Sequence, residues 1–200
     1  MNKKIVLTGG ACAGKTESLK YIKDYFTIKG YNVYTVSEMA TILIPGGITA
    51  QKIGGKNFQE LVVNMQLELQ KTFEKAVKLS NSTNNLIIFD RCPIDAMMFI
   101  RKEELDEIVQ KLNTSYDEIL NSYDGIIHLE TVAKRFPELY SYDNEARQEE
   151  MNVTIKADNR LIEAYKKHPK RVIVESYKDF NEKIKHVIKG IEQILSLIHI

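Results

Sequence analysis

The feature that most constrains this chain of 200 residues is a glycine-rich stretch near its N-terminus. A short apolar run, Ile5 to Leu7, leads into Gly9-Gly10-Ala11-Cys12-Ala13-Gly14-Lys15-Thr16, and a segment with helical periodicity follows. This order is typical of a phosphate-binding loop, in which glycines let backbone N–H groups turn around a polyphosphate and a helix N-terminus adds partial positive charge. Lys15 is expected to reach the β- and γ-phosphates, and the Thr16 hydroxyl to bind Mg²⁺. A glycine-rich turn before an ordinary helix explains the eight residues alone, but not the strand–loop–helix order.

Composition favours a folded protein and narrows its partners. Hydrophobic residues make up 44% of the chain and the net charge is +1, so we expect a single globular domain over 1–200. The balanced charge gives no overall electrostatic footprint for nucleic acid or an anionic membrane, although a local basic patch is left open. The first apolar run ends at Leu7, too short for a signal peptide or a membrane span, so a cytoplasmic protein is expected.

The two cysteines, Cys12 and Cys92, are expected to be free thiols in that compartment. Each follows a predicted strand, so they could lie close together. A regulatory disulfide is one interpretation, and two small residues that fill tight space is the other.

Five apolar segments predict strands, and segments with helical spacing separate them. The predicted strands are Ile5–Leu7, Asn32–Ser37, Leu86–Asp90, Gly125–Leu129 and Arg171–Glu175. This alternation predicts an α/β fold, a three-layer arrangement with a five-stranded parallel sheet and helices on both faces. Two further segments are irregular. The glycine-rich residues 45–56 are expected to be mobile, and residues of about 131–150 are expected to form a lid over the site.

Acidic residues stand at the ends of three of these strands, Glu38, Asp90 and Glu130, at the sheet edge where such folds bind ligands. Asp90 ends a continuous apolar strand, the position at which a phosphate-binding-loop protein holds Mg²⁺ directly or through water. The alternative is an acid that caps the strand or pairs with Arg91. Glu38 follows the second strand and is either a general base, a ligand for a substrate hydroxyl, or a capping acid at a helix start.

Three arginines are candidate clamps on a transferring phosphoryl group, because a planar guanidinium neutralises developing charge. They are Arg91, Arg135 and Arg147, and Arg147 ranks first because it opens the helix after the irregular segment. Most arginines are merely solvated, and that interpretation stands beside each of them. His128, inside a predicted strand, is expected to be a hydrogen-bonded core residue, and no His or Cys spacing indicates zinc.

Taken together, these motifs resemble a known family. The loop with Leu7 and Thr8, the sequence Val36-Ser37-Glu38-Met39-Ala40, and Phe89-Asp90-Arg91 with Asp95 are similar to the AAA-type P-loop domain shared by ribosylnicotinamide kinases and TRP translocation-defect proteins. The resemblance spans about residues 3–195. It implies a nucleoside/nucleotide-kinase-like P-loop NTPase fold, with Asp90 as the Walker B acid and a lid around Arg147. Some members of that family are GTP-binding, and they commonly have proline where this chain has Ala11 and Ser37.

The leading functional hypothesis is a Mg²⁺-dependent small-molecule kinase that moves the γ-phosphoryl group of ATP to a hydroxyl, with Lys15, Asp90, Arg147 and Glu38 as catalytic residues. The alternative is a GTP- or ATP-binding regulatory or adaptor NTPase with slow or no hydrolysis, although the chain lacks an Asn-Lys-x-Asp guanine-reading motif. A ring-forming AAA+ motor is disfavoured, since 200 residues leave no room for its helical lid domain. The phosphoryl acceptor, the base preference and the oligomeric state are left open.

Overall fold

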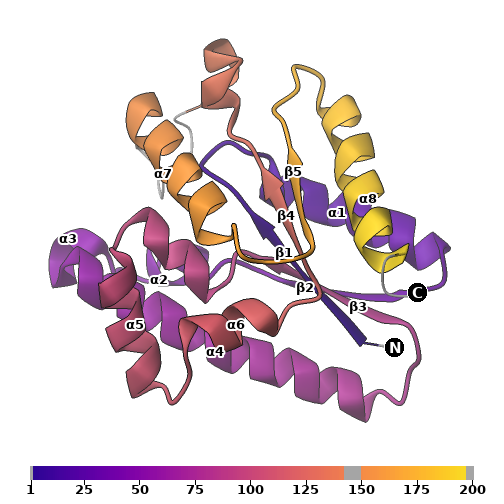
Figure 1. Ribbon diagram of the computed structural model, residues 1–200, viewed down its shortest axis with the longest axis horizontal. Helices are drawn as coiled ribbons and strands as arrows, with labels where there is room; N and C mark the ends of the chain where they lie inside the picture. The colour runs from indigo at the N-terminus through magenta and orange to yellow at the C-terminus, as the bar shows by residue number, and fades with distance from the viewer. Residues whose placement is uncertain (1, 142–149, 197–200) are drawn as a thin grey trace.

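The centre of the protein is a parallel sheet of five strands in the order β2-β3-β1-β4-β5 (Figure 1). The computed structural model describes residues 2–141 and 150–196. The five-stranded parallel α/β sheet expected from the sequence is confirmed, although the second and fifth strands each end one residue earlier than predicted. The strands are β1 (Asn2–Thr8), β2 (Asn32–Val36), β3 (Asn85–Asp90), β4 (Gly125–Leu129) and β5 (Arg171–Val174).

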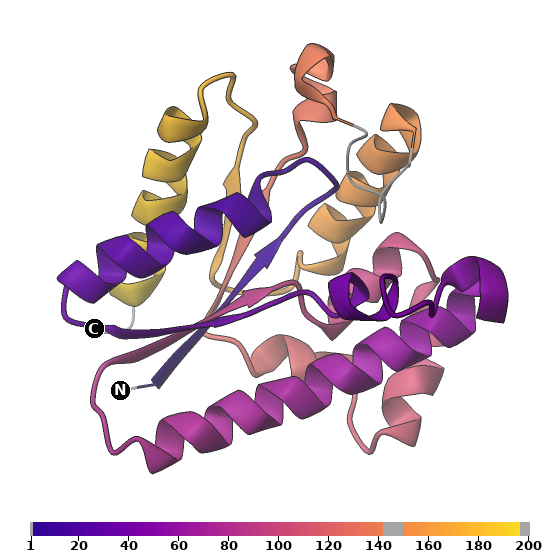
Figure 2. The same cartoon turned by 180° about the vertical axis from the view of Figure 1, so that it is seen from behind.

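Helices cover both faces of the sheet. Helices α1 (Lys15–Ile28) and α8 (Phe180–Ser196) lie on one face, as the view from behind makes plain (Figure 2). The other face carries α4 (Gly55–Leu79), α5 (Lys102–Lys111), α6 (Tyr116–Asn121) and α7 (Met151–Ala164). Short elements complete the chain: α2 (Ala40–Leu43), α3 (Ala50–Ile53) and the 3₁₀ turns η1 (Pro93–Met98), η2 (Val132–Lys134) and η3 (Pro137–Leu139).

Apolar side chains of β1 point alternately to the two faces of the sheet, so both faces need helices to cover them. Ile5 and Leu7 pack into the core under α1 and α8, whereas Val6 between them packs into the core under α4–α7. All three side chains are fully buried. Burying a side chain of this kind contributes roughly 1.5–3 kcal/mol relative to leaving it in water. Apolar strands buried on both faces therefore hold the sheet between two helical layers.

The strand register determines which polar residues meet at the sheet edge. Leu7 pairs with Asp90 across β1 and β3, and Thr8 pairs with His128 across β1 and β4. The loop after β1 and the residues after β3 and β4 therefore leave the sheet side by side. The segment 45–56, expected from its glycines to be mobile, contains the short helix α3. Among the helices of residues 2–141 and 150–196, none is both long and apolar enough to cross a bilayer.

Candidate functional site

The loop between β1 and α1 has a backbone that only glycine accommodates at two of its positions. Gly9 has φ 138° and Gly14 has φ 77°, both in the region that L-residues avoid. A Cβ atom at Gly9 would lie 2.0 Å from the carbonyl oxygen of Leu129, and one at Gly14 would lie 2.8 Å from the ring of Phe180. The two glycines thus allow close contact with β4 and α8 as well as the turn itself.

The cation and the hydroxyl of this loop are already engaged within the protein. Lys15 is 2% exposed, and its Nζ donates to the carbonyl oxygens of Gly9 (3.0 Å) and Gly10 (2.8 Å). The Thr16 hydroxyl donates to Oδ2 of Asp90 at 2.8 Å. Lys15 therefore lies inside the curve of the loop, and Thr16 at the start of α1 faces Asp90 at the end of β3.

Asp90 has the environment of a metal ligand. It is 2% exposed, and its Oδ1 has no hydrogen-bond partner in the described part of the chain. A buried carboxylate oxygen without a partner costs free energy unless a cation or water completes it. Hydroxyl and carboxylate oxygens are the donors that Mg²⁺ prefers, and Mg²⁺ commonly uses one or two carboxylates plus substrate phosphates. The residues present fit that ion. No group of three or more His, Cys, Asp or Glu side chains within residues 2–141 and 150–196 forms a metal cluster.

Arg91 organises the neighbouring acids rather than pairing with Asp90. Its Nε donates to Oε1 of Glu38 at 2.9 Å, and its Nη1 donates to Oδ2 of Asp95 at 3.1 Å and to the carbonyl oxygen of Gly9 at 3.1 Å. Burial alone would lower the pKa of Arg91, but the charges of Glu38, Asp95 and Asp90 outweigh it and raise that pKa. The guanidinium is thus held in place with its full charge, and it links the phosphate-binding loop to Glu38.

Asp95 completes this buried group from the other side. Thr8 donates to its Oδ1 at 2.8 Å and the Tyr165 hydroxyl donates to the same atom at 2.5 Å. Burial raises the pKa of Asp95, and the Arg91 charge with these two hydroxyls opposes the rise without cancelling it. Asp95 therefore links α7's end to β1 and holds Arg91 in place.

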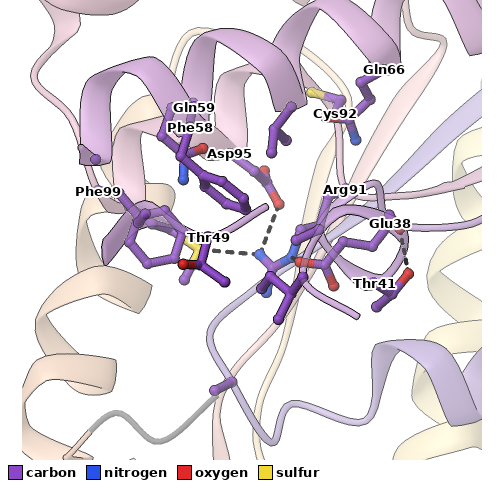
Figure 3. Close-up of a pocket in the computed structure, with 18 of the residues that line it drawn as sticks. Glu38, Thr41, Thr49, Phe58, Gln59, Gln66, Arg91, Cys92, Asp95 and Phe99 are labelled. Atoms are coloured by element: carbon purple, nitrogen blue, oxygen red, sulfur yellow. Dashed lines mark hydrogen bonds and ion pairs between the residues drawn. The ribbon is translucent and has the colours of Figure 1, made fainter. Parts of the chain in front are cut away.

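A cavity of about 690 Å³ opens beside Glu38 and Arg91 (Figure 3). It reaches Ala11 of the phosphate-binding loop at one end, and Phe58 and Phe99 form part of its wall. The set that lines it is Ala11, Glu38, Ala40, Thr41, Ile44, Thr49, Ala50, Gln51, Gly55, Phe58, Gln59, Val62, Gln66, Arg91, Cys92, Asp95, Ala96, Met98 and Phe99. We call this space the acceptor cavity.

Two glutamines that line the acceptor cavity are not predicted as site residues by the sequence. Gln59 and Gln66 are 6% and 4% exposed, and neither side-chain amide makes a hydrogen bond within residues 2–141 and 150–196. They lie about two turns apart on the same face of α4, where the sequence offers only an amphipathic pattern with two polar interruptions. Buried amides that line a cavity without partners have hydrogen bonds to offer a ligand.

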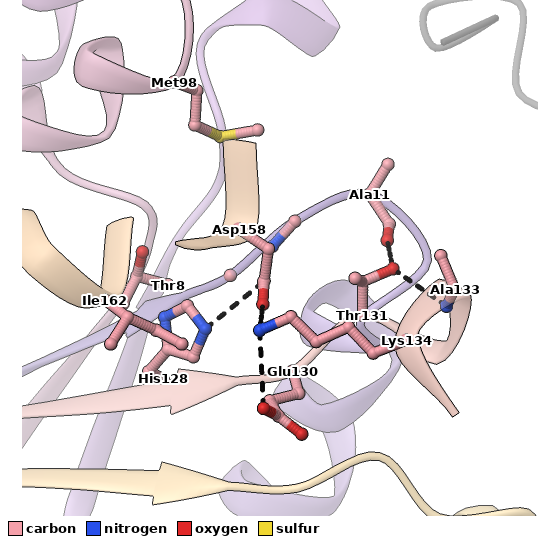
Figure 4. A network of polar contacts seen from close by, with 12 residues as sticks. Thr8, Ala11, Met98, His128, Glu130, Thr131, Ala133, Lys134, Asp158 and Ile162 are labelled. Carbon is pink, nitrogen blue, oxygen red and sulfur yellow. Dashed lines mark hydrogen bonds and ion pairs between the residues drawn. The ribbon is translucent and has the colours of Figure 1, made fainter. Parts of the chain in front are cut away.

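Behind the loop lies a charged network that the sequence also did not reveal (Figure 4). Asp158 of α7 is fully buried, and its Oδ1 accepts from the backbone N–H of Gly10 at 2.7 Å. Its Oδ2 lies 2.6 Å from Nζ of Lys134, and Oδ1 lies 3.2 Å from Nε2 of His128. Thr131 donates to the carbonyl oxygen of Ala11 at 2.6 Å. These contacts tie the loop to α7 and to the segment after β4.

Asp158 gives the network a pH signature. Burial would raise its pKa, but His128, Lys134 and the Gly10 amide outweigh burial and lower the pKa to about 2, from an ordinary 3.8. A carboxylate whose folded-state pKa is depressed stabilises the fold above its unfolded pKa, and that contribution is lost as pH falls through the folded value. The shift corresponds to roughly 2 kcal/mol at neutral pH.

We therefore expect Asp158→Asn to lower the free energy of unfolding at pH 7 by roughly 2 kcal/mol, because the charge facing Lys134 and His128 disappears. The difference between the two proteins should shrink as pH falls below about 4, where the unfolded chain's aspartate is protonated. Chemical unfolding at several pH values measures this. Asp117→Asn, at an exposed position of α6, is the control. An equal loss for Asp158→Asn at every pH would contradict the charge argument.

Of the remaining residues that the sequence singled out, the structure describes Arg135 and His128 and does not describe Arg147. Arg147 and residues 142–149 of the predicted lid lie outside the described residues. Arg135 forms ion pairs with Glu175 at 2.7 Å and Glu130 at 3.4 Å. His128 is fully buried in β4 as expected, but its contact is the Asp158 charge, and neither ring nitrogen makes a well-formed hydrogen bond in the described part of the chain.

The cysteines are free thiols, as predicted. Cys92 is 1% exposed, and burial raises its pKa to about 12. Because the thiolate is the reactive form, Cys92 is inert near neutral pH. Cys12 is partly exposed and donates to the carbonyl oxygen of Ser141 at 3.3 Å. The alternative of a regulatory disulfide is therefore poorly supported by the environment of Cys92.

A thiol titration tests that difference. We expect a disulfide reagent to modify one cysteine, Cys12, in the native protein and both cysteines after denaturation. Cys12→Ser should remove the native reaction, whereas Cys92→Ser should leave it unchanged. Two rapid modifications in the native protein would contradict the buried, high-pKa environment of Cys92.

Comparison with known proteins agrees with this fold. Among solved structures, a deoxyadenosine kinase from M. mycoides with bound dATP aligns with a TM-score of 0.54 and 16% sequence identity. The alignment covers 94% of this chain and 99% of that chain, and it shows a shared nucleoside-kinase-like P-loop fold. No curated protein matches the sequence. The narrower resemblance to ribosylnicotinamide kinases and TRP translocation-defect proteins stays a prediction.

A family model described as an AAA domain matches residues 4–183, which include most of β1, the other four strands, the phosphate-binding loop, Glu38, Asp90 and the network around Asp158. Since the match covers most of the chain, this protein belongs to the AAA-domain family.

Proposed function

We propose that this protein is a Mg²⁺-dependent kinase that transfers the γ-phosphoryl group of ATP to a hydroxyl of a nucleoside- or nucleotide-type small molecule. The observation that carries the proposal is one juxtaposition. The phosphate-binding loop and the acceptor cavity meet at Ala11, and Glu38 and Arg91 line the cavity there. A donor site and an acceptor site that share a border suit group transfer better than hydrolysis.

The loop residues 9–16 and the start of α1 form the donor site. Their backbone N–H groups and Lys15 would bind the triphosphate, and Lys15 would exchange the carbonyl oxygens of Gly9 and Gly10 for phosphate oxygens. Thr16 and Asp90 would hold Mg²⁺, which supplies neutralising charge at the phosphates when bound. ATP is the proposed donor, and GTP is the alternative to be tested beside it.

Glu38 is the proposed base on the acceptor side. As the acceptor oxygen bonds to the γ-phosphorus and the bond from that phosphorus to the β–γ bridging oxygen breaks, Glu38 takes the hydroxyl proton and ADP leaves. The hydrogen bond from Nε of Arg91 to Oε1 of Glu38 holds the carboxylate in position. This contact favours a role within the cavity over the alternative of a helix cap at α2. Arg147 is the proposed further cation, on sequence grounds alone.

The shape of the acceptor cavity supports a nucleoside-type acceptor. Phe58 supplies an apolar wall for a flat ring, and the amides of Gln59 and Gln66 offer donors and acceptors to the edge of that ring. A nucleoside joins a flat ring to hydroxyl groups through its sugar. One such molecule would place its ring beside Phe58 and a hydroxyl near Glu38. The structural likeness to a deoxyadenosine kinase supports the same class.

Transfer of labelled phosphate tests the proposal. The protein is incubated with Mg²⁺ and γ-labelled ATP or GTP, and with single acceptors that include deoxyadenosine, other nucleosides and ribosylnicotinamide. Label in a phosphorylated acceptor is the expected result. Label in inorganic phosphate alone, with no acceptor modified, would instead favour the regulatory NTPase.

Gln66→Leu, which removes one amide at nearly constant volume, should raise the KM for the acceptor and leave the KM for ATP unchanged.

A further inference from the structure

A second cavity, of about 990 Å³, lies on the same side of the sheet between η1, the start of α5 and helix α7. We call it the basic groove. It shares Phe99 with the acceptor cavity, so the side chain of Phe99 forms part of the boundary between the two spaces. Phe99 is 53% exposed, which is unusual for a large apolar ring in this chain and leaves its surface open to a ligand.

Positive charge dominates the walls of the basic groove. The charged residues that line it are five cations, Arg101, Lys102, Lys156, Arg160 and Lys167, and two acids, Glu104 and Glu163. The chain as a whole carries a net charge of only +1, so this is a local concentration. It is the local basic patch that composition left open.

The acids of the groove do not neutralise the cations on α7 and just after it. Glu104 pairs with Arg101 at 3.3 Å, and Glu163 pairs at 3.3 Å with Lys166, which lies outside the groove. Lys156, Arg160 and Lys167 have no carboxylate within 4.0 Å in the described part of the chain. Like charges at Lys156 and Arg160, four residues apart on one helix face, repel each other. An anion bound between them would relieve that repulsion.

One of these cations is held in place before any ligand arrives. Arg160 donates from Nη1 to the carbonyl oxygen of Met98 at 3.2 Å, which fixes its guanidinium across the gap between α7 and η1. The guanidinium keeps further N–H groups in the plane of the fork, the geometry that suits phosphate oxygens. A positioned arginine loses less conformational entropy on binding than a free one.

The floor of the groove is apolar. Ile100, Tyr116 and Ala164 are buried there, and Met97 and Phe99 are more exposed. The Nζ of Lys102 lies 4.8 Å from the centroid of the Tyr116 ring, so a cation covers part of that aromatic surface. An apolar floor with exposed Phe99 beside several cations suits a molecule that has both a ring and an anionic group.

We propose that the basic groove binds a small organic phosphate that carries an aromatic or heterocyclic ring. The ring packs on Phe99 and Met97, and the phosphate accepts hydrogen bonds from Arg160 and Lys156. Because Phe99 also belongs to the acceptor cavity, occupancy of the groove changes the affinity of the acceptor. This second effect rests on the proposed kinase function, whereas binding to the groove does not.

Methyl NMR measures the binding directly. Phenyl phosphate is titrated at millimolar concentration into protein labelled at its methionine methyl groups, with Mg²⁺-ATP present to occupy the phosphate-binding loop, and Met97→Leu assigns the reporter. We expect the Met97 signal to shift and saturate. Lys156→Glu/Arg160→Glu should weaken that binding by about tenfold or more. The control Lys189→Glu, an exposed lysine on α8, should not change it.

Two simpler probes separate charge from ring. Inorganic phosphate and benzyl alcohol should each bind the groove about tenfold more weakly than phenyl phosphate. If inorganic phosphate binds as tightly as phenyl phosphate, the ring makes no contribution to binding and that part of the proposal is wrong. If benzyl alcohol binds as tightly as phenyl phosphate, the phosphate charge makes no contribution and that part is wrong. Absence of any Met97 shift, with thermal unfolding of both variants unchanged, would overturn the site itself.

Steady-state kinetics then tests the effect on the acceptor. Phenyl phosphate should change the KM for the acceptor in the unmodified protein and not in Lys156→Glu/Arg160→Glu. A Met97 shift without a change in KM would overturn the coupling through Phe99. A protein that binds phenyl phosphate at Met97 but transfers no label in any assay would count against the proposed function and not against the groove.

Discussion

Lys15→Ala is expected to lower the rate of phosphoryl transfer by about 10²–10³, the loss found when one preorganised donor to a developing negative charge is removed. Lys15 is buried inside the loop, and it donates to two carbonyl oxygens that a phosphate would replace. Initial rates of labelled transfer at saturating ATP measure the effect. Most of the loss should be in kcat, since the transition state carries more charge on the transferring group than the ground state does.

The controls for Lys15 have to separate charge from packing. Lys15→Met keeps most of the apolar stem and removes the ammonium, so it should lose a similar factor if charge is the cause. Lys20→Ala, at an exposed lysine in the next turn of α1, should leave the rate unchanged. Unchanged turnover in Lys15→Met, with nucleotide binding intact, would contradict the assigned role.

Much of the fold could be predicted because apolar strands have a local signature. Ile5 to Leu7 and Leu86 to Phe89 are continuous apolar runs followed by turn residues, and both form central strands. The N-cap of α6 also has a local signature, Ser115 three residues before Glu118, and Ser115 Oγ accepts from the Glu118 amide at 3.2 Å, whereas the Glu118 carboxylate accepts from the Thr114 hydroxyl at 3.1 Å. Patterns of this kind depend on neighbours in sequence, so no knowledge of the tertiary structure is required.

The candidate site was only partly predictable, because its contacts cross the chain. Gly10 and Asp158 are 148 positions apart, and nothing near Asp158 marks it as the partner of a loop amide. The same holds for Gln66, a polar residue on a helix whose pattern gives no sign of a cavity. Asp90 and Glu38 could be found because they follow strands, and the edge of a parallel sheet is where ligands bind.

The role of Arg91 could not be decided from the sequence, which made it only a candidate clamp; its contacts in the fold indicate a different role. As a clamp on phosphate it would have to turn toward the ligand, yet its Nε and Nη1 already donate to Glu38, Asp95 and the Gly9 carbonyl, which holds the guanidinium in place. A buried arginine between two carboxylates is a structural support whose removal would leave uncompensated charges. We therefore assign it to positioning Glu38, which makes Glu38 the residue to test.

Glu38→Gln is expected to lower kcat by about 10²–10⁴, the usual contribution of a positioned general base. Glutamine has nearly the same size as glutamate, and its amide oxygen can still accept from Nε of Arg91, so the cavity should keep its shape. What it cannot do is take a proton from the acceptor hydroxyl. The KM for ATP should stay unchanged, because Glu38 lies on the acceptor side.

The measurement is labelled transfer to the acceptor that the panel identifies, with Glu103→Gln on the exposed face of α5 as the matched control. Thermal unfolding should be similar for Glu103→Gln and the unmodified protein and lower for Glu38→Gln, because buried Arg91 loses one of its two paired carboxylates, so rates are compared at a temperature where all three proteins are folded. A Glu38→Gln variant with normal kcat and a raised acceptor KM would mean that Glu38 binds the hydroxyl without accepting its proton. A variant with normal kcat and normal KM would instead leave Glu38 as a residue that only balances the charge of Arg91.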